Sequence, residues 1–141
     1  MSKTACLSDL TFVIPTLNGT HRLLILCQWL AHCNFNGTCI VLDATFLSQA
    51  DKFEEYAFIE YLHVPQADTI KSLTYGVQRV NTNFSAFLGD DDLPLLKSYE
   101  KCVSVLLNQK HLDSCYGHAS FINFDELFYL DDEIIYVPQE V

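Results

Sequence analysis

Three consecutive aspartates, Asp90, Asp91 and Asp92, follow the apolar run at 84–88 after a single glycine, Gly89. Like charges this close repel one another and destabilise a fold unless a positive charge lies among them. A hard divalent cation, bound through oxygen and retaining waters, relieves that repulsion. The alternative is an acidic start to the next helix, where carboxylates favour the positive helix end. Because one aspartate suffices for that role, the triplet predicts a site for a metal or a metal–diphosphate.

Two further polar segments are candidate ligand contacts. Pro15, Thr16 and Asn18 follow the first apolar run of the chain, and Asp43 follows the second. Thr16 and Asn18 suit contacts to a nucleotide, although both residue types also make ordinary turns. Asp43 suits a hydrogen bond to a base or ribose, and it equally suits a cap on the turn that follows. Basic residues are few here, so a bound diphosphate would need a metal ion for most of its neutralisation.

Alternating strand-like and helix-like stretches must position these segments. Strands are expected at short, β-rich apolar runs, namely 10–14, 39–42, 58–64 and 84–88. Helices are expected between and after them, at 20–33, 48–56 (the weakest), 68–80 and 94–108. The third helix is expected to present one apolar face made of Ile70, Leu73, Val77 and Val80. Strands alternating with helices imply right-handed βαβ units, and therefore an α/β fold with a mostly parallel sheet and flanking helices.

The end of the chain differs in style from the rest. Two apolar runs, at 127–130 and 134–137, flank Asp131 and Asp132, which predicts a C-terminal hairpin. A bent strand or two is expected before it, around 115–116 and 121–122. The hairpin completes the predicted α/β architecture.

The topology predicts where a ligand would bind. In an open parallel sheet, ligands bind beyond the carboxyl ends of the strands, at the point where the strand order reverses. With the four strands in the order 3-2-1-4, the first and the fourth are neighbours at that point. The polar turn after the first strand and the acidic triplet after the fourth would then face the same crevice.

The composition excludes several other classes of protein. The chain of 141 residues has room for one domain, half of its residues are hydrophobic, and its net charge is −10. Such an acidic chain repels a phosphate backbone, which argues against nucleic acid as a partner. No apolar run approaches the ~20 residues that span a bilayer, so no transmembrane segment is expected. The start of the chain also lacks the apolar core of a secretory signal.

The cysteines and histidines do not predict a metal site, and the cysteines are better explained as reduced thiols. None of the six cysteines forms a Cys-x-x-Cys pair, and the five histidines lack metal-ligand spacing, so a zinc site is not supported. Because the chain can build a core and shows no export signal, we expect reduced thiols and a cytoplasmic protein. Glycine-rich dinucleotide and P-loop motifs are absent from the sequence.

Three segments resemble the family 2 glycosyltransferases, which have the Rossmann-like GT-A fold. The first is similar to the Val-Ile-Pro-Thr-Tyr-Asn of that family and reads Val13-Ile14-Pro15-Thr16-Leu17-Asn18. The second is similar to Val-Val-Asp-Asp-Gly-Ser and reads Ile40-Val41-Leu42-Asp43-Ala44-Thr45. The third is similar to the strand and Asp-x-Asp motif and reads Phe87-Leu88-Gly89-Asp90-Asp91-Asp92. Their spacing also suits the family, and the resemblance covers residues 9–120.

The resemblance implies a donor site for a nucleotide-sugar, which we expect to be a UDP-sugar. Its nucleotide would be bound by Pro15, Thr16, Asn18, Asp43 and Asp90. A cation, Mg²⁺ or Mn²⁺, would be held against the diphosphate, and we assign Asp91 and Asp92 as its ligands. Leu42 and Gly89 stand where the family often has aspartates.

The resemblance also implies an activity, the transfer of a sugar from the metal-bound donor to the hydroxyl of an acceptor such as a glycan. The catalytic base of the family lies in a later, acceptor-binding half, and the acidic cluster at 131–133 fits a hairpin turn better. We therefore expect residues 1–141 to be a single GT-A-like donor-binding domain, part of a longer enzyme or a shortened homologue, with no base assigned. The alternatives are a non-catalytic nucleotide-sugar-binding module of the same fold and a nucleotidyltransferase.

Overall fold

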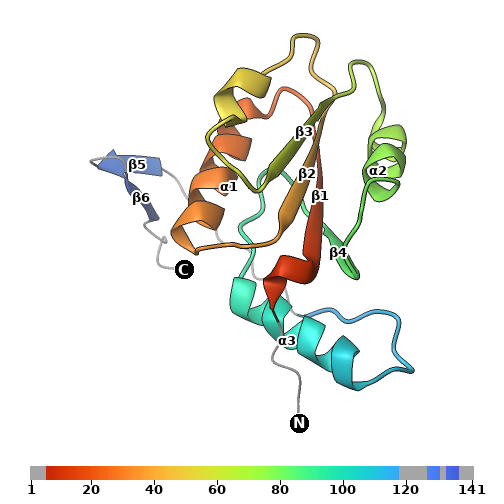
Figure 1. Ribbon diagram of the computed structural model, residues 1–141. Coiled ribbons are helices and arrows are strands. Elements are labelled where there is room, and N and C mark those ends of the chain that lie inside the picture. Colours follow the sequence, from red (N-terminus) through yellow and green to blue (C-terminus); the bar gives the residue numbers. More distant parts are fainter. Residues whose placement is uncertain (1–5, 118–126, 131–132, 137–141) are drawn as a thin grey trace, which may run out of the picture.

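The computed structural model describes residues 6–117, 127–130 and 133–136. Its main sheet consists of β1 (Leu10–Thr16), β2 (Thr38–Asp43), β3 (Ile59–His63) and β4 (Phe84–Phe87). Every pairing in this sheet is parallel, and the strand order is β3-β2-β1-β4 (Figure 1). The predicted α/β, Rossmann-like class is therefore confirmed, and the strand order is the one assumed in placing the ligand site.

Both faces of the central strands are buried. Successive side chains of a strand point to opposite faces, so Phe12 and Ile14 of β1 enter one hydrophobic cluster and Val13 enters another. β2 divides its side chains in the same way, with Val41 in the first cluster and Leu42 in the second. This is why both strands are continuous apolar runs in the sequence instead of alternating ones.

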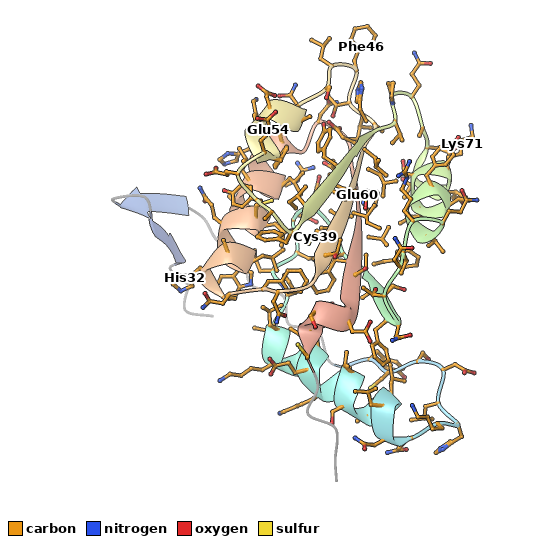
Figure 2. The ribbon with its side chains drawn as sticks, in the orientation of Figure 1. His32, Cys39, Phe46, Glu54, Glu60 and Lys71 are labelled. Carbon is orange, nitrogen blue, oxygen red and sulfur yellow. The ribbon has the colours of Figure 1, made fainter. Side chains whose placement is uncertain are left out.

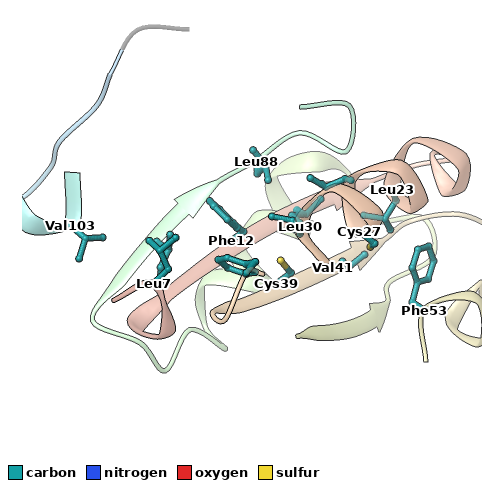
Figure 3. Packing of buried hydrophobic residues seen from close by; sticks show 14 residues of the cluster. Leu7, Phe12, Leu23, Cys27, Leu30, Cys39, Val41, Phe53, Leu88 and Val103 are labelled. Atoms are coloured by element: carbon teal, nitrogen blue, oxygen red, sulfur yellow. The ribbon is translucent and has the colours of Figure 1, made fainter. Parts of the chain in front are cut away.

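The helix α1 (Thr20–His32) covers the first face of the sheet. Its residues Leu23, Cys27 and Leu30 pack over the strands beside Phe12 (Figure 3). Full burial of a leucine side chain contributes about 1.5–3 kcal/mol relative to leaving it exposed. Because these three residues recur at helical spacing, they share one face of α1, and their burial attaches the helix to the sheet.

The helix α2 (Thr69–Val77) covers the opposite face and meets the sheet with small residues (Figure 1). Gly76 is buried so close to the sheet that a Cβ atom there would lie 2.5 Å from Val13 Cγ1. The predicted apolar face of this helix is partly wrong, because Ile70 is 78% exposed and Val77 is 51% exposed. Close packing around the glycine places these two larger side chains outside the contact.

The helix α3 (Leu96–Asn108) follows Pro94, close to the predicted start of the last helix. Its residue Val103 joins the cluster on the α1 face. A 3-10 helix, η2 (Ala50–Phe53), stands where a longer helix over 48–56 was expected. A second 3-10 helix, η1 (Leu7–Asp9), leads directly into β1.

The strands β5 (Leu127–Leu130) and β6 (Glu133–Tyr136) pair antiparallel, as the predicted hairpin requires. Cys115 and Tyr116 do not lie in a strand, contrary to expectation. The other segment expected to be extended there, 121–122, lies outside the described residues.

All six cysteines are free thiols. Cys27 and Cys39 lie inside the cluster on the α1 face, where burial raises the pKa of Cys27 to about 12 and that of Cys39 well above its ordinary value. Within the part of the chain that the structure describes, no helix combines the length and the apolar character needed to cross a membrane.

Candidate functional site

Three polar residues form one row across the carboxyl edge of the sheet. Thr16 ends β1 and is in register with Asp43 at the end of β2, which is in register with His63 at the end of β3. Main-chain hydrogen bonds extend the row, from Ala44 N to Thr16 O (2.9 Å) and from Val64 N to Asp43 O (2.8 Å). The first two polar segments of the sequence therefore lie on the same edge.

The acidic segment takes the place of a strand beside the end of β1. The last pair in the β1–β4 ladder joins Val13 to Phe87, and Leu88 N then donates to Val13 O over 3.1 Å. β1 continues through Thr16, where its neighbour on this side is no longer β4 but the turn at 89–92. This is the point where the strand order reverses.

Asp90 joins the two sides of this junction. Thr16 Oγ1 donates to Asp90 Oδ2 over 2.5 Å, and the Arg22 guanidinium donates from Nε to Oδ1 (3.0 Å) and from Nη2 to Oδ2 (3.1 Å). Asp90 is only 8% exposed, whereas half of the Arg22 side-chain surface is exposed. The hydrogen bonds with Asp90, and then its charge, raise the pKa of Arg22, so the guanidinium is always charged. The expected meeting of the polar turn and the acidic triplet is confirmed here.

Gly19 makes room for this arrangement. It is the residue that precedes α1, and a Cβ atom there would lie 1.9 Å from Asp90 Oδ2 and 2.4 Å from Thr16 Oγ1. Any larger side chain would therefore occupy the space of the Asp90 carboxylate. The glycine explains how a carboxylate from the turn after β4 fits against the start of α1.

Asp43 is turned into the protein. It is 2% exposed, and its Oδ1 accepts from Thr45 N over 2.8 Å while its Oδ2 accepts from the Tyr61 hydroxyl. That hydroxyl in turn accepts from Gln49 N over 3.0 Å. Burial, and then the hydrogen bond to Asp43, raise the pKa of Tyr61 to about 12. With both oxygens engaged, the geometry favours the turn-capping interpretation of Asp43 over contact with a base.

Thr45 links the loops that follow β1 and β2. Its Oγ1 accepts from Asn18 N over 2.8 Å, and its carbonyl oxygen lies 2.8 Å from His63 Nε2. Asn18 adopts a left-handed backbone conformation, with φ of 53°, which asparagine tolerates better than most residues. Its side chain is exposed, and Pro15 lies half-buried in β1. Pro15 and Asn18, two of the five predicted nucleotide contacts, thus lie at this edge, and Asn18 is held in place through its main chain.

Asp91 and Asp92 lie on the exposed side of the same turn. Asp92 Oδ2 accepts from Gly89 N over 3.0 Å, and Asp92 N donates to Gly89 O over 3.3 Å. A Cβ atom at Gly89 would lie 2.8 Å from Asp91 Oδ1 and 2.9 Å from Asp92 Oδ2. Carboxylate oxygens of both residues therefore converge on the space beside Gly89, which we call the Gly89 cradle.

The Gly89 cradle suits an ion that takes few ligands from the protein, such as Mg²⁺, better than one whose ligands all come from side chains. Among the described residues, no group of three or more His, Cys, Asp or Glu side chains is arranged to hold a metal. Mg²⁺ in proteins commonly takes one or two carboxylates and completes its coordination with water and substrate phosphates. Two converging carboxylates on an exposed turn match that pattern, whereas Asp90, paired with Arg22, does not contribute a free oxygen.

Several residues of this edge carry no recognisable signal in the sequence. Arg22 and Tyr61 act on aspartates that are 68 and 18 positions away, and such distant pairings leave no local pattern. Phe46, at the tip of the loop after β2, is largely exposed (Figure 2). Leu17, in the loop after β1, is exposed as well, so the polar row has an apolar rim.

Comparisons with known proteins do not identify a family for this chain. No protein-family model matches the chain, and no curated protein matches it.

Proposed function

We propose that the chain binds a nucleotide-sugar at the carboxyl edge of its sheet and provides the donor site of a GT-A, family 2-like glycosyltransferase. The observation that supports this proposal most strongly is the hydrogen bond between Thr16 and Asp90, which are 74 positions apart. It joins two of the three segments whose sequences resemble that family. A ligand site at the point where the strand order reverses needs the turns after β1 and β4 side by side, and this contact joins them.

Each part of the edge has a role in this proposal. Asp91 and Asp92 would hold Mg²⁺ or Mn²⁺ at the Gly89 cradle. When bound, the ion stabilises negative charge on the departing nucleoside diphosphate. Thr16 and Asn18 would contact the nucleotide, and the exposed Phe46 offers a ring on which a base can stack.

The acceptor in this proposal is a hydroxyl compound such as a glycan, and the reaction takes place in the cytoplasm. Deprotonation of an acceptor hydroxyl needs a carboxylate or histidine within hydrogen-bond reach. Asp43 and Asp90 do not meet that need, because their oxygens accept hydrogen bonds within the protein. This observation favours, as a second candidate, a module of the same fold that binds the nucleotide-sugar without transferring it.

Calorimetry with UDP tests the proposal. The chain is expected to bind UDP in the presence of Mn²⁺, and Asp91→Asn is expected to weaken that binding by about tenfold or more. Asp51→Asn, an exposed aspartate of η2, is the matched control and should bind as the wild type does. Absence of UDP binding with and without Mn²⁺ would refute both candidates.

Turnover then separates the candidates. A glycosyltransferase consumes a UDP-sugar, even if only by slow hydrolysis to UDP and free sugar, whereas a binding module does not. A nucleotidyltransferase would instead consume a nucleoside triphosphate, which neither candidate does. Release of pyrophosphate from a triphosphate, without consumption of a UDP-sugar, would overturn the proposed class of reaction.

A further inference from the structure

Arg22 is a cation fixed at the edge where the proposed ligand binds. Its Nε and Nη2 groups donate to the two oxygens of Asp90, which is the paired geometry that orients a guanidinium best. The carboxylate itself is held by Thr16 and confined by Gly19. Arg22 therefore presents its guanidinium in one orientation, and its side chain loses little conformational entropy when a ligand binds.

The guanidinium still has unused donors. A guanidinium carries more N–H groups than one carboxylate can accept, and those on Nη1 have no hydrogen-bond partner among the described residues. Half of the Arg22 side-chain surface is exposed. A charged group with free donors and solvent access can bind an anion, whereas Asp90 is 8% exposed and has its oxygens engaged.

The surroundings of Arg22 also suit a phosphate. The charge of Asp91 contributes to the raised pKa of Arg22, so the guanidinium lies within electrostatic reach of the Gly89 cradle. Arg22 also belongs to the first turn of α1, which begins at Gly19 without a side chain to cap it. The amide groups of such a turn favour anions. A diphosphate at this edge would thus meet a cation on each side, one from the protein and one bound at the cradle.

We propose that Arg22 donates to a phosphate oxygen of the bound nucleoside diphosphate, and that Asp90 is the positioning residue that orients Arg22 and is not a metal ligand. This inference rests on the proposed function, because it concerns the same ligand. It differs from the sequence-based expectation, in which Asp90 contacts the nucleotide directly and the metal supplies most of the neutralisation.

Binding of UDP and of uridine, each measured by calorimetry with Mn²⁺ and with EDTA, tests the role of Arg22. Arg22→Gln is expected to weaken UDP binding by about tenfold or more, the loss typical of a charged hydrogen bond, and to leave uridine binding unchanged. Arg22→Lys keeps the charge but loses the paired geometry, so an intermediate loss is expected. Arg79→Gln, which removes a half-exposed arginine paired with Glu60, is the matched control and should bind UDP normally.

The role of Asp90 is tested by the dependence on metal. Asp90→Asn is expected to weaken UDP binding with Mn²⁺ and with EDTA by the same factor, so the enhancement by Mn²⁺ is preserved. Loss of that enhancement in Asp90→Asn would show that Asp90 is a metal ligand and would overturn the inference. Wild-type affinity for UDP in Arg22→Gln would also overturn it while leaving the proposed function intact. A wild-type chain that binds no UDP would refute the proposed function itself.

Discussion

Replacing Gly19 by alanine is expected to displace the Asp90 carboxylate. The new Cβ atom would lie 1.9 Å from Asp90 Oδ2, 2.4 Å from Thr16 Oγ1 and 2.9 Å from Arg22 Nη2. Cβ atoms essentially never approach other heavy atoms within 3.0 Å, so the carboxylate oxygen must move by about 1 Å. A movement of that size breaks the 2.5 Å hydrogen bond from Thr16.

The expected cost has two main parts. Loss of a buried hydrogen bond to a charged group costs about 1.5–3 kcal/mol, and the strain of overpacking adds about 1–3 kcal/mol. The ion pair with Arg22 adds little, because Arg22 is half exposed and screened by solvent. Gly19→Ala should therefore lower the free energy of unfolding by roughly 3–5 kcal/mol.

Urea denaturation measures this loss, and the chain contains a matched control. Gly117→Ala makes the same substitution where no atom lies within 4 Å of the new Cβ, so its midpoint should equal that of the wild type. In an Asp90→Ala background the nearest clash partner and its hydrogen bond are absent, and only the side-chain ends of Thr16 and Arg22 remain close, so the cost of Gly19→Ala should be clearly smaller. An unchanged midpoint for Gly19→Ala, or an equal cost in both backgrounds, would refute the reasoning.

Gly76→Ala is expected to lower the free energy of unfolding by about 1–3 kcal/mol, because its Cβ would lie 2.5 Å from the buried Val13 Cγ1. Urea denaturation beside the same control measures this, and a wild-type midpoint contradicts it. Gly89→Ala should weaken Mn²⁺ binding by about tenfold, because the new Cβ fills the Gly89 cradle. A titration with Mn²⁺ followed by electron paramagnetic resonance measures this affinity. Wild-type affinity in the variant would exclude a metal at the Gly89 cradle. Near neutral pH, alkylation should reach Cys6 long before Cys27, because hydrogen bonding lowers the pKa of the exposed Cys6 thiol and burial raises that of Cys27 to about 12. Peptide mass spectrometry measures both rates, and equal labelling in the folded protein would be inconsistent with these environments.

The strands and their parallel pairing could be predicted because the relevant signals are local or general. Each strand is a short apolar run closed by proline, glycine or aspartate, and parallel connections have a fixed hand. With the strand order 3-2-1-4 assumed in addition, these two facts bring the turn of Thr16 and the turn of Asp90 to the same junction. Periodicity does not report how closely a helix approaches a sheet, however. The small Gly76 decides that distance, and it leaves Ile70 and Val77 outside the contact.

The roles of individual aspartates could not be predicted in the same way. Asp90 and Asp91 are adjacent in sequence, yet Asp90 points into the protein and Asp91 is exposed. The difference comes from Arg22, which binds the Asp90 carboxylate although the two residues are 68 positions apart. Asp43 likewise owes its environment to Tyr61 on the neighbouring strand. Electrostatic roles of this kind depend on tertiary neighbours, which no single stretch of sequence displays.

The long separation between Thr16 and Asp90 has a consequence for how the protein assembles. β1, β2 and β3 follow one another along the chain, whereas β4 returns across the sheet to the far side of β1. Closing so long a loop costs more entropy than closing a short one, so contacts of this kind are expected to form late in folding. A chain still emerging during synthesis contains the turn after β1 long before it contains the acidic turn at 89–92. The junction of Thr16 and Asp90 is therefore a feature of the finished sheet alone, and a ligand bound there would stabilise the fully folded state selectively.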